Sequence, residues 1–113
     1  MKLRVEKYVK GKNRLANAHW SVKHKEGKDW EWALRAATNK PLPKADKKVK
    51  LRITSIRVKK LDYDGFVYGC YPILDALKRL GAIVDDSEEW IEVEYKQEKR
   101  GYGRECQTIV EFL

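Results

Sequence analysis

The chain has 113 residues, 42% of them hydrophobic and 11% aromatic, which suits one domain, residues 1–113, with a single modest core. This composition excludes a disordered chain, and no stretch approaches the ~20 apolar residues of a membrane span. The net charge of +8 is uneven, because residues 1–60 hold 19 Lys and Arg against 5 Asp and Glu, whereas residues 61–113 hold 6 against 12. A basic surface favours a polyanion such as nucleic acid, and the alternative that the lysines only maintain solubility stays open here.

The first half of the chain predicts a strand, a loop and a helix. Residues 2–9 alternate apolar and charged side chains, which is typical of a strand and not of a signal peptide. Residues 10–25 mix Gly, Asn, Lys and His and are interpreted as a long basic loop. From residue 26 to residue 38, apolar side chains including Trp30 recur at helical spacing. Two prolines in residues 39–46 then indicate a linker.

Residues 48–58 predict a second strand, with a change of phase near Ser55 that indicates a bulge or bend. An apolar stripe at helical spacing follows: Phe66, Cys70, Ile73, Leu77 and Leu80. Gly81 suits the position just past the helix end. Pro72 either kinks this helix or marks the start of its regular part.

Two further strands are predicted at residues 89–97 and 104–112, where apolar and polar side chains alternate. They look like a hairpin, because only a short charged loop with two glycines separates them. The predicted fold is therefore α+β, with a mixed sheet of about four strands packed against two helices. Cys70 and Cys106 show no metal-binding spacing, and free thiols in a reducing cytoplasm are favoured over a disulfide.

Four aspartates surround the second helix: Asp62 and Asp64 precede it, and Asp85 and Asp86 follow it. Each has a structural alternative, since Asp64 could cap the helix and the others could shape turns. Together they would form an oxygen-only site, which suits Mg²⁺ or Mn²⁺ rather than zinc and, in a basic protein, points to phosphoryl chemistry. A helix of some sixteen residues spans about 24 Å, so both ends reach one metal only if the helix is shorter, the loop returns, or a dimer partner contributes.

The segment 62–86 resembles the signature of RusA-type Holliday-junction resolvases. The matching residues are Asp62-Tyr63-Asp64-Gly65, then Asp75-Ala76-Leu77, then Gly81, then Asp85-Asp86. The resemblance implies an α+β homodimer with one Mg²⁺-dependent acidic site per subunit, which resolves four-way DNA junctions by paired nicks in recombination and repair, in bacteria and prophages. It further implies that Asp62, Asp64 and Asp86 are the catalytic metal ligands, with Asp85 as a neighbour.

Two positions depart from that pattern. The family's asparagine after the second aspartate is Gly65 here, and its lysine four residues before Asp75 is Tyr71. A tyrosine donates one hydrogen bond but brings no cation to the phosphate. The main hypothesis is that the protein is an endodeoxyribonuclease acting on branched DNA. The alternative is a DNA-binding protein of the same fold with weak or no turnover. An enzyme acting on small nucleotides is the third candidate.

Basic residues outside the signature are candidates for phosphate contacts. They are Lys10, Lys12, Arg14, Lys23, Lys25, Lys28, Lys59 and Lys60. His19 and His24 lack a second metal-binding motif, so contact with DNA or solvent is favoured over metal binding. Trp30 is predicted in the core, whereas Trp20 and Trp32 suit either an interface or a DNA-facing surface.

Overall fold

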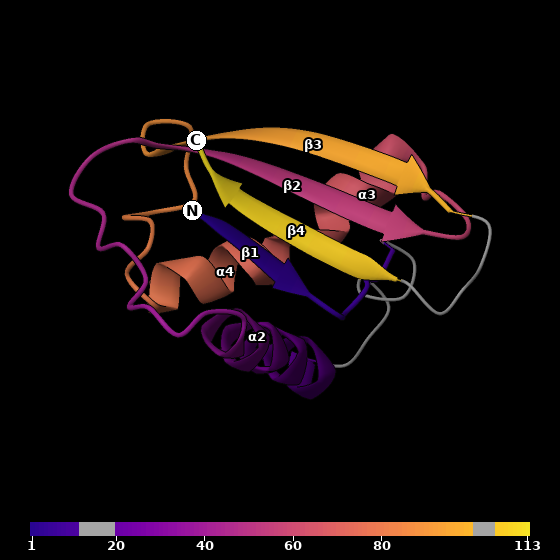
Figure 1. Ribbon diagram of the computed structural model, residues 1–113, viewed down its shortest axis with the longest axis horizontal. Coiled ribbons are helices and arrows are strands. Elements are labelled where there is room, and N and C mark those ends of the chain that lie inside the picture. The colour runs from indigo at the N-terminus through magenta and orange to yellow at the C-terminus, as the bar shows by residue number, and fades with distance from the viewer. Residues whose placement is uncertain (12–19, 101–105) are drawn as a thin grey trace.

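The computed structural model describes residues 1–11, 20–100 and 106–113 of the chain. It contains four strands and three helices in this part of the sequence (Figure 1). In chain order they are β1 (Lys2–Val5), α2 (Trp20–Ala36), β2 (Val49–Arg57), α3 (Tyr63–Gly69), α4 (Tyr71–Arg79), β3 (Ile91–Lys99) and β4 (Gln107–Phe112). No helix among the described residues is long and apolar enough to cross a membrane.

The four strands form one mixed sheet in the order β1-β4-β2-β3, so β3 and β1 are its two edges (Figure 1). β2 runs parallel to β3 with Val49 opposite Ile91, and antiparallel to β4 with Ile53 opposite Val110. β1 pairs antiparallel with the other side of β4. The predicted α+β class with a mixed sheet of four strands is therefore confirmed, and the predicted second helix is divided into α3 and α4.

The main core lies between one face of the sheet and the helices. Leu3, Leu51, Ile53 and Val110 from the strands are fully or almost fully buried. They belong to one cluster with helix residues that include Trp30, Leu34, Phe66, Ile73 and Leu77. Trp30 is 0% exposed, which confirms its predicted place in the core. Burial of such large apolar side chains is the main source of stability for a sheet covered by helices on one face.

The predicted hairpin of the last two strands is wrong, because β2 lies between β3 and β4. Arg52 at the middle of β2 explains part of this order: its guanidinium lies 3.0 Å from Glu94 of β3 and 3.9 Å from Glu111 of β4. The predicted bulge near Ser55 is also wrong. The β2–β3 register is continuous from Val49 to Arg57, and the change of phase arises because Thr54, Ser55 and Ile56 are buried on both faces of a central strand.

The predicted basic loop over residues 10–25 is wrong at its end, because α2 already begins at Trp20. Within residues 21–36 of α2, the buried residues are Glu26, Gly27, Trp30 and Leu34, so residues 21–25 show no buried apolar periodicity that would have revealed a helix. The edge strand β1 ends at Val5, four residues before the predicted limit, although Val9 is buried. The remainder of that loop, residues 12–19, lies outside the described residues.

Candidate functional site

The first two aspartates lie at the start of α3, and their roles differ. Asp62 is the N-cap: its backbone is extended, and its carboxylate accepts a hydrogen bond from the backbone N–H of Gly65 at 3.3 Å. Asp64 lies in the first turn, where a negative charge is stabilised by the helix dipole. The capping role considered for Asp64 therefore belongs to Asp62, while the Asp64 side chain is exposed.

The helical segment breaks at Cys70, which ends α3 and caps α4. Pro72 occupies the first turn of α4, where its missing N–H costs nothing, so the second of the two expectations for Pro72 is confirmed. At the break, Gly69 packs directly against the backbone carbonyl of Lys10, and no side chain larger than hydrogen fits there. The break also brings Tyr68 and Tyr71 together in an edge-to-face pair with ring centroids 5.7 Å apart.

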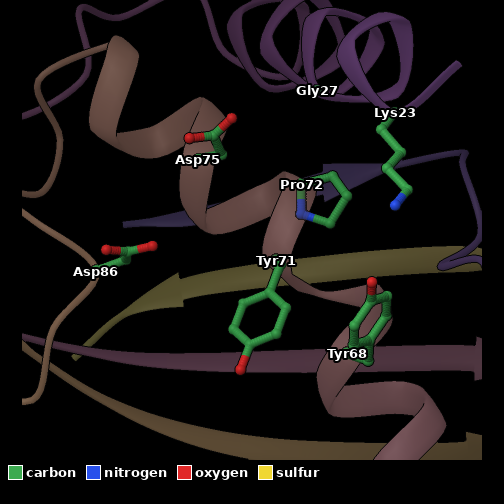
Figure 2. A pocket seen from close by; sticks show the side chains of 7 residues that line it. All are labelled: Lys23, Gly27, Tyr68, Tyr71, Pro72, Asp75 and Asp86. Carbon is green, nitrogen blue, oxygen red and sulfur yellow. The ribbon is translucent and has the colours of Figure 1, made fainter. Parts of the chain in front are cut away.

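A pocket of about 250 Å³ lies between α2 and α4 (Figure 2). Its lining residues are Lys23, Gly27, Tyr68, Tyr71, Pro72, Asp75 and Asp86. Figure 2 shows Lys23 reaching down from α2 toward Tyr68, and Asp86 on the chain that follows α4, on the other side of Tyr71. The pocket therefore combines one cation, two carboxylates and two phenol groups.

A second groove of about 290 Å³ adjoins this pocket on the α3 side. It is lined by Tyr63, Asp64, Val67, Tyr68 and Tyr71. Because Tyr68 and Tyr71 line both hollows, Asp64 and Asp86 flank the same pair of tyrosines. Asp64 in the first turn of α3 and Asp86 after α4 thus line two adjoining hollows that share two tyrosines.

Asp85 and Asp75 are engaged in ion pairs. Lys78 lies 3.0 Å from Asp85, and Arg79 lies 3.0 Å from Asp75 one helical turn away. The hydrogen bond from Lys78 lowers the pKa of the Asp85 carboxyl, and the backbone N–H of Asp86 lowers it further. Asp85 raises the pKa of Lys78 in return. The cation nearest to the Asp85-Asp86 pair is therefore committed to Asp85.

No three His, Cys, Asp or Glu side chains converge in a metal-binding group within residues 1–11, 20–100 and 106–113. The three predicted ligands Asp62, Asp64 and Asp86 therefore do not form a ready-made cage in a single chain. Mg²⁺, however, commonly binds through one or two carboxylates together with substrate phosphates. The exposed carboxylates of Asp64 and Asp86 fit that more open type of site.

The predicted DNA-binding cations are distributed over different parts of the fold. Lys23 lines the pocket, and Lys28, Lys59 and Lys60 are exposed. Lys25 forms an exposed ion pair with Asp29 at 3.0 Å. Lys10 lies 2.9 Å from the carboxylate of buried Glu26 and is three-quarters buried itself. Lys12, Arg14 and His19 lie outside the described residues, as does the side chain of Trp20.

Sequence reasoning missed a second basic region. Arg35, Lys40, Lys44 and Arg79 line a groove of about 560 Å³ at the ends of α2 and α4, with Glu31 as its single acidic residue. The signal was present in the linker, where Lys40 and Lys44 enclose two prolines that hold the chain extended.

No protein-family model matches this chain, and no curated protein matches it. The resemblance to RusA-type resolvases therefore depends on the chain's own residues, of which only segment 62–86 is specific.

Proposed function

We propose that the protein is a Mg²⁺-dependent endodeoxyribonuclease that binds branched DNA and cleaves its phosphodiester bonds, with Mn²⁺ as an alternative ion. The observation that carries the proposal is the position of Asp64 and Asp86 on either side of Tyr68 and Tyr71. An exposed carboxylate, Asp86, in the pocket that Lys23 also lines, on a chain of net charge +8, suits a metal-bridged phosphodiester better than a neutral ligand.

Each residue of the site has a defined role in this proposal. Lys23 binds a phosphate oxygen, and the Tyr71 hydroxyl donates a hydrogen bond to the same group. Asp64 and Asp86 hold the ion, and Asp62 fixes the first turn of α3 and so the direction of Asp64. A bound Mg²⁺ supplies charge stabilisation at the phosphate and lowers the pKa of a water molecule.

The substrate and assembly follow from the resemblance of residues 62–86. A four-way junction carries two equivalent strands to be cut, and a homodimer with one site per subunit matches that symmetry. The exposed lysines Lys28, Lys59 and Lys60 contribute phosphate contacts outside the site. No disulfide joins Cys70 and Cys106, which suits a reducing cytoplasm, where recombination and repair of DNA take place.

A second candidate function is structure-specific DNA binding without turnover. It is favoured by the engagement of two of the four aspartates, since Asp62 caps α3 and Asp85 pairs with Lys78. The absence of a three-ligand group among the described residues also favours it. The two candidates share DNA binding and differ only in metal-dependent cleavage.

The test is cleavage of labelled four-way, three-way and linear duplex DNA by the purified protein, with Mg²⁺, with Mn²⁺ and with a chelator. The proposal predicts nicks that require the metal and are confined to branched DNA. Binding of branched DNA without nicks under either metal would leave the second candidate, and no preference for branched DNA would contradict both.

Asp64→Asn is the variant of choice, because Asp64 is exposed and makes no capping bond, so its loss leaves the fold intact. The matched control is Asp46→Asn, which removes an equal charge from an exposed site in the segment between α2 and β2. Asp64→Asn abolishes cleavage and keeps DNA binding, whereas Asp46→Asn cleaves like the wild type.

A further inference from the structure

We infer that a second nucleic-acid contact lies on the C-terminal half of α2 and the adjoining linker, and that it binds a single strand. Its parts are the groove of about 560 Å³ lined by Arg35, Lys40, Lys44 and Arg79, and the exposed indole of Trp32. The inference rests on the proposed DNA binding and adds a strand type and a surface to it.

The groove has a surplus of positive charge that the described part of the chain does not neutralise. Lys44 donates to the carbonyl oxygen of Leu80 at 2.7 Å, and Arg79 pairs with Asp75 at 3.0 Å. Arg35 and Lys40 form no ion pair within the described residues, and both are exposed. Two unpaired cations beside an open groove are complementary to the phosphates of a polyanion.

Trp32 adds a feature that phosphate binding alone does not need. It is 75% exposed, the highest value among the exposed large hydrophobic residues in the described part of the chain. Lys28 and Arg35 lie four residues before and three residues after it, on the same face of α2, and both are exposed. Arg35 therefore belongs to both the groove and the face that carries Trp32.

This combination identifies a single strand rather than a duplex. The flat face of a base is available for stacking only when the base is unpaired, and exposed aromatic rings between cations are the usual platform for single strands. In the inferred complex, one base stacks on Trp32 while neighbouring phosphates contact Lys28 and the Arg35-Lys40 side of the groove.

The experiment is a binding titration of the whole protein by fluorescence anisotropy at several salt concentrations. The probes are a labelled single strand of about 15 nucleotides, a duplex of the same length and labelled poly-glutamate, which has the charge but no bases. The single strand is expected to bind most tightly. Equal affinity for poly-glutamate, or tighter binding of the duplex, would overturn the inference.

Two variants locate the contact. Trp32→Ala is expected to weaken single-strand binding about 5- to 150-fold, as loss of one stacked base does. The double variant Arg35→Ala, Lys40→Ala is expected to reduce the slope of log affinity against log salt by about 1.4, because each single-strand phosphate contact contributes ~0.7. The control double variant Lys2→Ala, Arg4→Ala removes the same two residue types from β1 and is expected to keep the slope.

Unchanged binding by Trp32→Ala, or equal losses in the two double variants, would contradict the inference. Failure of the inference is distinguishable from failure of the proposed function, because both double variants are also assayed for nicking of four-way junctions. If the protein nicks junctions but the α2 variants show no loss of single-strand binding, the inference is wrong and the proposed function stands. If the protein binds single strands through α2 but makes no metal-dependent nicks, the proposed nuclease activity is wrong and the inference stands.

Discussion

The carboxylate of Glu26 on α2 lies 2.9 Å from the ammonium group of Lys10 and 3.0 Å from that of Lys7. The indole N–H of Trp30 donates to the same carboxylate at 3.1 Å, and Glu26 is 2% exposed. Two cations thus neutralise one buried anion and attach residues 7–10 to the helix. Since residues 9 and 10 also contact Gly69, this cluster fixes the segment against which α3 ends.

Glu26→Gln is expected to lower the free energy of unfolding by about 3 kcal/mol at neutral pH, because it leaves two partly buried lysines without their counter-charge. Burial raises the pKa of Glu26, but the hydrogen bonds from Lys10 and Lys7 outweigh it, so the pKa lies below its ordinary value of 4.5. A depressed pKa means that this stability is present above the unfolded value and is lost as the pH falls through the folded value.

Urea denaturation of both proteins between neutral pH and the region below pH 4.5 checks this prediction. The difference in stability should narrow as Glu26 becomes protonated in the wild type. A difference that stays constant over that range would show that the charge of Glu26 is not the source of the effect.

Gly65→Asn introduces the residue that RusA-type resolvases carry at this position and is expected to destabilise the fold by about 1 kcal/mol. A Cβ atom at position 65 would lie 2.7 Å from Oδ1 of Asp62, so the capping carboxylate must move and the cap is weakened. Asp62→Ala should cost a similar amount. In the double variant the two losses should not add, because both remove the same hydrogen bond. Additive losses in thermal unfolding would argue against the shared cause.

Gly69→Ala and Gly27→Ala are expected to differ sharply although both glycines are buried in helices. A Cβ at position 69 would overlap the Lys10 carbonyl, which belongs to the backbone and cannot move like a side chain. The free energy of unfolding is therefore expected to fall by about 1–3 kcal/mol. At position 27 the nearest atom is Nη1 of Arg79 at 3.3 Å, the end of a flexible side chain. That variant should be near neutral, because alanine favours the helix. Equal losses would contradict the contacts described at the break.

The sequence predicted the elements of this fold better than their pairing. Strands are recognised from local alternation, as in Ile91, Val93 and Tyr95, whereas the partner of a strand depends on contacts far along the chain. β3 and β4 are neighbours in sequence, which favours a hairpin, yet Arg52 of β2 bridges Glu94 and Glu111 and lies between them. In β2, residues 54–56 are buried on both faces of the sheet. In the sequence this burial interrupts the alternation of apolar and polar side chains, which was interpreted as a bulge.

For the candidate site too, some features could be predicted from the sequence and others could not. Asp64 and Asp86 line two different hollows that share Tyr68 and Tyr71, and their use of one metal ion stays a prediction. The individual roles were not readable, since Asp62 rather than Asp64 accepts the capping bond and only the fold shows that Lys78 reaches Asp85. The basic groove was missed because Arg35 and Arg79 are far apart in sequence and meet only through the packing of α2 on α4.

Tyr71→Lys tests the position at which the resemblance is weakest. Tyr71 is 52% exposed, so the replacement should not disturb the core. A cation beside Lys23 and the two carboxylates should raise the rate of metal-dependent nicking about tenfold or more, since it stabilises charge on the phosphate. The control is Tyr63→Lys, an equally large change at a more exposed tyrosine of the same groove. Equal rate increases in both variants would indicate a general gain in DNA affinity instead.

The measurement that tests the central claim most directly is single-turnover nicking of a labelled four-way junction by the wild type and Asp64→Asn, with and without Mg²⁺. The account predicts paired nicks in opposed strands that require Mg²⁺ and disappear in the variant, while both proteins bind the junction equally. Nicks that persist in Asp64→Asn, or a wild type that binds the junction and never nicks it, would contradict it.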